Sequence, residues 1–129
     1  MSGRYLLDTN VVIALFAGEP EVRARFDDAP EIFLSPTVLG ELLYGAYHSV
    51  RLAANSARVE EFAVACSRLV IDDETGRRYA EIRKALRNIG KPIPENDIWI
   101  AATALRYGLT LVTRDGHFKE VSGLPFVAW

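Results

Sequence analysis

Four acidic residues lie at positions where a carboxylate can bind a metal ion or act in catalysis. Asp8 and Asp115 each follow a short apolar run, and Asp97 heads an almost entirely apolar helix. Glu41 interrupts a second apolar helix. Two carboxylates 4 Å apart repel each other by roughly 4 kcal/mol at an effective dielectric near 20. A divalent cation removes that penalty, and all-oxygen ligands suit Mg²⁺ or Mn²⁺. Convergence of these four side chains would therefore indicate phosphoryl chemistry.

Three of the acids also have local alternatives. Asp8 can cap the helix that follows it, and Asp115 can be a turn residue. Asp97 can be an ordinary acid in the first turn of its helix. Glu41 has no local use on an apolar helix, which favours a shared acidic site over four separate roles.

The helix that carries Glu41 also contains two glycines. Gly40 and Gly45 each cost a helix about 1 kcal/mol relative to alanine. We therefore expect another group to approach this helix closely.

Hydrophobic periodicity predicts the elements that position these residues. Short apolar runs predict buried strands at 5–7, 32–34, 69–71, 109–112 and 126–127. Helical spacing and capping residues predict helices at 11–16, 20–26, 36–48, 59–69, 73–89 and 98–107. Short apolar strands that alternate with helices are typical of parallel β-α-β units. We predict one domain over residues 1–129, a three-layer α/β/α sandwich around a mostly parallel sheet of about four to five strands. Ligands bind beyond the carboxyl ends of such strands, where Asp8 and Asp115 lie.

Composition limits the class of protein. The 129 residues include 15 Lys and Arg against 17 Asp and Glu, and this balance excludes the strongly basic profile of sequence-specific DNA binders. The longest apolar stretch, 11–17, is far shorter than the roughly 20 residues that cross a bilayer. The single cysteine, Cys66, cannot form an internal disulfide, and its place on an apolar helical stripe favours a packing role. These features predict a cytoplasmic protein that does not enter the membrane.

Four segments, taken in order, resemble the motifs of PIN-domain ribonucleases and, more narrowly, of the VapC toxins of bacterial and archaeal toxin–antitoxin pairs. They are Leu-Asp-Thr-Asn at 7–10, Ser-Pro-Thr-Val-Leu-Gly-Glu-Leu at 35–42, Asn-Asp-Ile-Trp-Ile-Ala-Ala at 96–102 and Leu-Val-Thr-Arg-Asp-Gly-His-Phe at 111–118. Each motif is weak alone, but the ordered set covers nearly the whole chain. The resemblance implies the PIN-like sandwich and a metal-dependent endoribonuclease.

The resemblance also assigns roles within the site. It implies that Asp8, Asp97 and Asp115 bind Mg²⁺ (or Mn²⁺), and that Glu41 completes the acidic ring or holds a second ion. A bound metal would activate water for in-line attack on phosphorus, leaving a 5′-phosphate and a 3′-hydroxyl. Thr113 would hydrogen-bond a carboxylate or position the water; alternatively, it is simply a β-branched residue that ends a strand.

The VapC resemblance implies particular partners as well. We expect an RNA substrate, a homodimer and a cognate VapB-type antitoxin whose C-terminal segment covers the acidic site. The N-terminal part of that antitoxin would bind operator DNA, so contact with DNA would be indirect.

A basic segment precedes the third motif and is a candidate for steering RNA phosphates. Its members are Arg77, Arg78, Arg83, Lys84, Arg87 and Lys91, and Arg114 is a further candidate beside the last acid. The alternative is a solvated helix face in which Glu81 pairs with Arg77 and Lys84.

Three competing interpretations remain at this point. His48 and His117 could act as general acid and base without metal, although we interpret both as rim or packing residues. A phosphoacceptor receiver domain also places acids at strand ends, but it needs paired acids after the first strand and a lysine after the last. A PIN fold that only binds RNA or a partner is the third.

Overall fold

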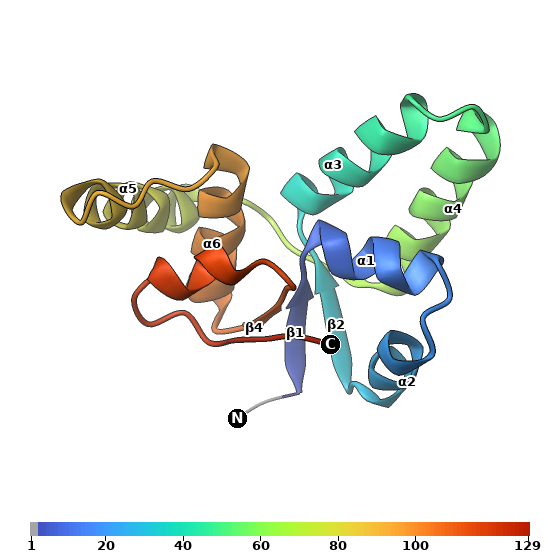
Figure 1. Cartoon of the computed structure of the whole chain (residues 1–129), viewed down its shortest axis with the longest axis horizontal. Helices are drawn as coiled ribbons and strands as arrows, with labels where there is room; N and C mark the ends of the chain where they lie inside the picture. The colour runs from blue at the N-terminus through green and yellow to red at the C-terminus, as the bar shows by residue number, and fades with distance from the viewer. Residues whose placement is uncertain (1–2) are drawn as a thin grey trace.

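The computed structural model describes residues 3–129, in which helices alternate with short strands (Figure 1). In chain order the elements are β1 (Arg4–Leu7), α1 (Thr9–Phe16), α2 (Pro20–Asp28), β2 (Glu31–Leu34), α3 (Pro36–Tyr47), α4 (Leu52–Ala65), β3 (Ser67–Arg68), α5 (Asp73–Asn88), α6 (Glu95–Tyr107), β4 (Thr110–Val112), the 3₁₀ helix η1 (Gly116–Glu120) and β5 (Phe126–Val127).

The strands form one sheet in the order β3-β2-β1-β4-β5, and every pairing is parallel. This confirms the predicted α/β sandwich class. The strand order reverses between β1 and β4, which are adjacent although about a hundred residues separate them in the chain. Such a switch point is where open α/β sheets bind ligands, beyond the carboxyl ends of the strands. A receiver domain has the order 2-1-3-4-5, so this alternative is excluded.

Helices flank the sheet and fix the strand ends. In Figure 1 the carboxyl end of β1 lies between α3 and α4 on one side and α5 and α6 on the other. Ser35 caps α3 by accepting a hydrogen bond from the amide of Val38 at 3.2 Å. Gly108 ends α6 in the left-handed conformation (φ 66°), so the chain turns directly into β4. Among residues 3–129, no helix is long and apolar enough to cross a membrane.

The segment around the third strand differs from the prediction. The helix expected at 59–69 runs from Leu52 to Ala65, and the strand expected at 69–71 is Ser67–Arg68. The early turns of α4 are exposed and carry no apolar pattern, so periodicity missed them. The apolar residues Val70 and Ile71 lie beyond the sheet and are exposed. Cys66 is buried directly after α4, and burial raises the pKa of its thiol to about 11, as expected for packing.

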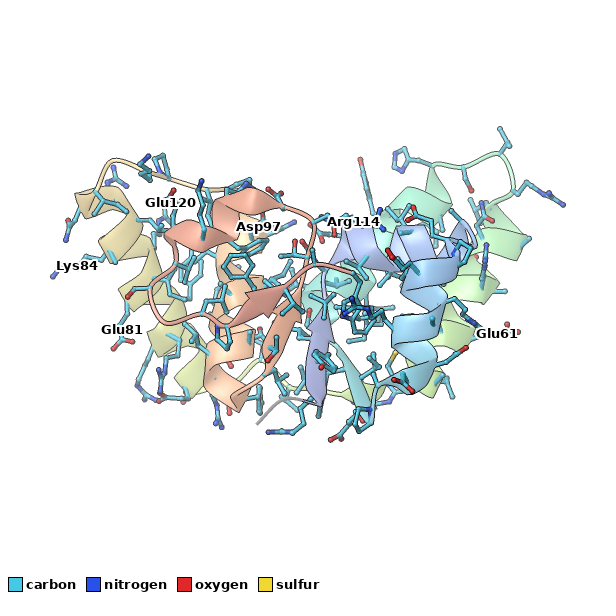
Figure 2. All side chains as sticks on the ribbon, turned by 60° about the horizontal axis from the view of Figure 1, so that its bottom comes forward. Glu61, Glu81, Lys84, Asp97, Arg114 and Glu120 are labelled. Carbon is cyan, nitrogen blue, oxygen red and sulfur yellow. The ribbon has the colours of Figure 1, made fainter. Side chains whose placement is uncertain are left out.

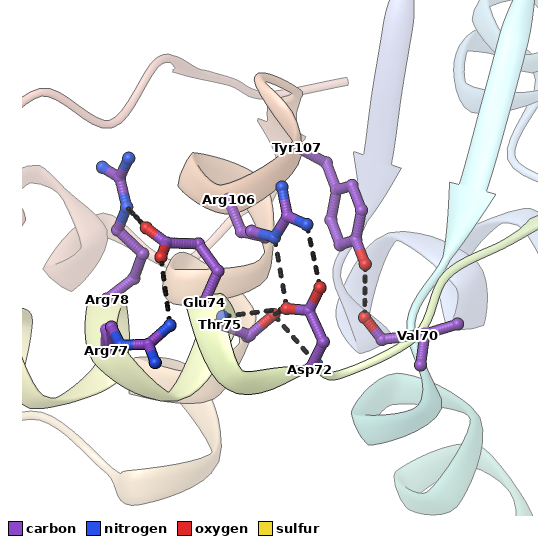
Figure 3. Close-up of polar contacts among 8 residues, drawn as sticks. All are labelled: Val70, Asp72, Glu74, Thr75, Arg77, Arg78, Arg106 and Tyr107. Carbon is purple, nitrogen blue, oxygen red and sulfur yellow. Dashed lines mark hydrogen bonds and ion pairs between the residues drawn. The ribbon is translucent and has the colours of Figure 1, made fainter.

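A polar clamp fastens α5 to the C-terminal end of α6 (Figure 3). Asp72 caps α5 in a reciprocal capping box with Thr75. The same carboxylate accepts hydrogen bonds from Arg106 Nε at 3.2 Å and Arg106 Nη2 at 2.8 Å. The Tyr107 hydroxyl donates to the Val70 carbonyl at 2.5 Å. The Arg106 guanidinium holds the pKa of Asp72 well below its usual range.

The clamp predicts an acid-sensitive contribution to stability. Because the Asp72 pKa is depressed in the folded state, its contribution is complete above its ordinary pKa of about 3.9 and is lost as the pH falls toward the folded value. Asp72→Asn should therefore lower the melting temperature by a few degrees at pH 7, with the deficit shrinking below about pH 4. Thermal unfolding followed by circular dichroism measures both. Asp73→Asn, at an exposed position in the first turn of α5, is the matched control. An equal deficit in the two variants at pH 7 would contradict the role of the clamp.

Candidate active site

Asp8 is the most deeply placed acid and joins the ends of β1 and β4. The residue is 5% exposed. Its Oδ1 accepts a hydrogen bond from the amide of Thr9 at 2.8 Å, and its Oδ2 accepts one from Thr113 Oγ1 at 2.7 Å. Thr113 Oγ1 in turn accepts from the amide of Asp115 at 3.0 Å. Asp8 thus caps α1, as its local alternative proposed, and also faces the other strand end.

Glu41 reaches the same region from α3. Its Oε1 accepts a hydrogen bond from the Thr9 hydroxyl, and its Oε2 accepts one from Asn96 Nδ2 at 3.1 Å. The carboxylate is therefore tied to the residue after Asp8 and to the residue before Asp97. Its place on an apolar helix is explained by these contacts across elements.

Asp97 and Asp115 meet through His117. His117 Nε2 lies 2.6 Å from Asp97 Oδ2, and His117 Nδ1 lies 2.9 Å from Asp115 Oδ1. One ligand atom from each of the three residues falls within 4.8 Å of the others, a spacing suitable for a metal ion. His117 lies at the rim, as interpreted, with a side chain that is 31% exposed, but it also contacts two of the acids. The η1 helix turns the chain after Asp115 and brings the imidazole back onto the acids, which sequence spacing alone did not reveal.

The acids share one electrostatic environment. Burial raises the pKa of Asp8, and the nearby charges of Asp97 and Glu41 raise it further, against the lowering effect of its hydrogen bonds. Burial likewise raises the pKa of Asp97, with Asp115 and Glu41 adding to the increase and His117 opposing it. The structure therefore brings all four predicted acids into mutual influence. The ionised cluster is unfavourable alone and suits a bound cation.

Two other expectations about this region had different outcomes. His48 is exposed at the end of α3, where its Nδ1 lies 3.0 Å from the Tyr44 carbonyl and its ring packs on Tyr44. It is the packing residue expected. In contrast, apart from the backbone of their own helix and their chain neighbours, no atom of the described chain comes within 4 Å of a Cβ built at Gly40 or Gly45. The space beside both glycines is open, so the close approach expected there is absent from this chain.

The basic segment divides into two parts on α5. Glu74 pairs with Arg77 at 3.5 Å and with Arg78 at 3.1 Å, so Glu81 is not the partner that the alternative proposed. Closer to α6, Arg83 donates to the Tyr79 hydroxyl at 2.7 Å.

The remaining cations of that segment are Lys84, Arg87 and Lys91, and all three are exposed. No salt bridge involves them within residues 3–129. Arg114 is paired with Glu19 at 2.6 Å. Figure 2 shows Lys84 at the end of the molecule formed by α5 and Arg114 nearer its middle.

Comparison with known proteins agrees with this geometry. The sequence model of the PIN domain family matches residues 5–124. The chain belongs to the PIN domain family. Ribonuclease VapC2 of Haemophilus influenzae is 35% identical over 129 residues, covering 98% of each chain. The tRNA(fMet)-specific endonuclease VapC of Shigella flexneri is 33% identical with the same coverage. Within the PIN family, the chain therefore groups with the VapC ribonucleases.

Solved structures of VapC-containing complexes have the same fold. DNA-bound VapBC from Salmonella typhimurium matches with a TM-score of 0.92 and 30% identity, covering 100% of this chain and 99% of that chain. VapBC2 from Rickettsia felis, bound to a promoter DNA fragment, matches with a TM-score of 0.91 and 27% identity over 98% of each chain. The PIN-domain chain thus superposes over its full described length.

The acidic cluster predicts stabilisation by a divalent cation. A ligand that binds only the folded state stabilises it by about 2.7 kcal/mol at a concentration 100 times its Kd. Mn²⁺ added to EDTA-treated protein should raise the melting temperature, and Asp97→Asn should remove most of that increase because one ligand charge is lost. Differential scanning fluorimetry measures the shift. Asp27→Asn, on the exposed face of α2, should respond as the unaltered protein does, and equal shifts in all three proteins would contradict a cation site at Asp97.

Proposed function

We propose that this PIN-domain chain, over its whole length of 1–129, is a Mg²⁺- or Mn²⁺-dependent endoribonuclease and the toxin of a VapBC-type toxin–antitoxin pair. The observation that carries the proposal is the acidic cluster at the β1/β4 switch point, formed by residues from all four VapC-like motifs. One buried and three partly buried carboxylates that repel one another at a ligand-binding edge are favourable only when a cation offsets their charge.

The donor set fits a hard divalent ion. Asp8, Glu41, Asp97 and Asp115 offer carboxylate oxygens, and His117 adds an imidazole nitrogen that Mn²⁺ accepts more readily than Mg²⁺ does. When bound, the ion would lower the pKa of a water molecule and neutralise charge on the phosphodiester. Asp97 and Asp115 would hold it directly or through water, with Asp8 beside them and Glu41 completing the ring or holding a second ion.

The surrounding residues would keep the ligands in position. Thr113 donates to Asp8 while accepting from the Asp115 amide, so one hydroxyl links two of the acids. Thr9 donates to one oxygen of Glu41 and Asn96 donates to the other, which fixes the orientation of this carboxylate. Hydrogen bonds to the metal-binding side chains fix the orientation of those side chains. Their loss typically weakens metal affinity or activity 10- to 100-fold. We place Thr113 in this orienting role.

Substitution of the acids tests the proposed activity. Asp8→Asn and Asp97→Asn should each reduce RNA cleavage by roughly 100-fold or more, because losing a ligand forfeits several kcal/mol of transition-state stabilisation. Cleavage of a tRNA(fMet) transcript and of an unrelated structured RNA would be followed by gel electrophoresis, with and without EDTA. Asp27→Asn should retain activity. Full cleavage in EDTA would contradict the metal-dependent mechanism and favour the two-histidine chemistry. The expected 5′-phosphates of the products would be detected by direct ligation to an adaptor.

RNA must approach a cluster of negative charge, and the basic segment offers a route. Arg83, Lys84, Arg87 and Lys91 lie on or just after the part of α5 that leads to the start of α6 and Asp97. Arg77 and Arg78 are engaged by Glu74, Arg114 by Glu19, and Arg83 by Glu95 and Tyr79, so these four would have to exchange partners to bind phosphate. We therefore assign the steering role chiefly to Lys84, Arg87 and Lys91.

Charge removal tests this route through salt dependence. Arg87→Gln with Lys91→Gln should weaken binding of single-stranded RNA in EDTA and flatten the plot of log affinity against log salt by about 0.7 for each lost phosphate contact. Fluorescence anisotropy of a labelled RNA measures the slope. Arg23→Gln with Arg25→Gln removes the same charge from the exposed face of α2 and should leave the slope unchanged. Equal slopes in the two double variants would assign the segment to solvation.

The partner proposal rests on the surface beside the acids. A hollow of about 290 Å³ between α1, α3 and α4 reaches from Glu41 to the apolar side chains Ile13, Phe16 and Val59. An antitoxin segment with apolar side chains would fit there and cover the acidic cluster. Exposed Leu52 and Val64 on α4 supply apolar surface for a homodimer. DNA contact would come through the antitoxin, and the toxin would act in the cytoplasm.

A further inference from the structure

A second hollow beside the acidic cluster has a different chemistry from the apolar one. It has a volume of about 420 Å³ and lies between α3 and the start of α6. Tyr44 and Trp99 supply aromatic walls, Glu41 and Asn96 supply polar edges, and Gly40 lies at its helix wall. Tyr44 is 65% exposed, so its ring is accessible from solvent.

An aromatic stack supports one wall of this hollow. Trp99 stacks on Tyr79 with ring centroids 4.1 Å apart and an interplanar angle of 17°. The Tyr79 hydroxyl donates to Glu95 Oε2 at 2.8 Å and accepts from Arg83 at 2.7 Å. Trp99 is therefore held in a fixed orientation by Tyr79, which Glu95 and Arg83 anchor in turn. A rigid indole beside an open space can accept one more flat ring at little cost in conformational freedom.

The opposite wall has room for that ring to approach the helix. Among residues 3–129, a Cβ built at Gly40 would meet no atom within 4 Å outside the nearby backbone of its own helix and its chain neighbours. The helix keeps this glycine although alanine would favour it by about 1 kcal/mol. Open space at Gly40, with Trp99 and Tyr44 nearby, accounts for the glycine better than packing within the chain does.

We propose that this hollow binds a nucleobase of single-stranded RNA next to the phosphate that is cut. The inference rests on the proposed ribonuclease function, since Glu41 belongs both to the hollow and to the acidic cluster. Sequence-selective proteins stack unpaired bases on aromatic rings and read their edges by hydrogen bonds. The amide of Asn96 has both a donor and an acceptor for such an edge. Glu41 repels a phosphate from the hollow, so the base enters it while the backbone follows the cations of α5.

The binding test uses Trp99 as its own reporter. Trp129→Phe leaves Trp99 as the sole tryptophan. Single-stranded RNA hexamers of each base, titrated in EDTA so that metal-dependent cleavage cannot occur, should quench its fluorescence saturably. In that background Tyr44→Ala should weaken binding roughly tenfold, within the range for loss of one base–aromatic contact. Gly40→Leu fills the hollow and should abolish base-dependent quenching.

Matched controls separate the hollow from general effects on the protein. Tyr47→Ala removes an exposed tyrosine from the same helix but outside the hollow, and Gly76→Leu fills open space on α5. Both should quench like the parent. Gly40→Leu should not lower the melting temperature, since leucine is the better helix former. Unchanged quenching in Tyr44→Ala and Gly40→Leu, or equal losses in the controls, would overturn the proposal and leave the surface to a protein partner.

A cleavage test distinguishes this proposal from the function on which it rests. Two RNAs would be compared, one with an abasic nucleotide before the cut and one with an abasic nucleotide after it. One of the two should be cleaved roughly tenfold more slowly than the intact RNA, and the other at the normal rate. Tyr44→Ala should remove this difference. Quenching without cleavage would reject the ribonuclease and keep the base site. Cleavage with no abasic penalty on either side would keep the ribonuclease and reject the base site.

Discussion

The burial of Asp8 at the junction of β1 and β4 is the constraint on which the rest of the site depends. The carboxylate of a residue that is 5% exposed needs hydrogen-bond partners, and it has them in the Thr9 amide and the Thr113 hydroxyl. These partners come from opposite ends of the chain. The parallel pairing of β1 with β4 sets their separation, so the hydrogen bonds of the acid depend on this strand pairing. The site is thus a consequence of the strand order.

The same hydrogen bonds leave an electrostatic problem unsolved. Thr113 and Thr9 favour the ionised form of Asp8, yet burial and the charges of Asp97 and Glu41 raise its pKa on balance. His117 compensates in part by lying against Asp97 and Asp115. Neutral donors and one imidazole do not balance the charge of four carboxylates, whereas a bound divalent cation would. This mismatch explains why a chain of net charge −2 can act on RNA: its positive charge at the site would arrive as metal.

The sequence predicted the sheet and the four acids because both leave local patterns. Apolar runs followed by Asp8 or by Thr113 and Asp115 show where buried strands end, and Glu41 stands out against an apolar helix. The sequence did not place β3 or His117. The position of β3 is determined by pairing with Phe33 and Leu34 and not by the hydrophobicity of its own two residues. His117 enters the site through the path of η1, and that path is set by tertiary packing around the buried Phe118.

The helix α6 links the stability of the fold to the exposed chemistry of the site. Its N-terminal turn carries Asp97 among like charges, and the folded state gains nothing from their repulsion. Its C-terminal turn carries Arg106 and Tyr107, which bind Asp72 and the Val70 carbonyl (Figure 3). Between the two ends the helix buries Ile98, Ile100 and three alanines against the sheet and α5. Packing along the helix and the clamp at its C-terminal end therefore hold α6 in place. Repulsion at the acidic end can therefore persist in the folded state, because packing fixes the backbone that carries Asp97.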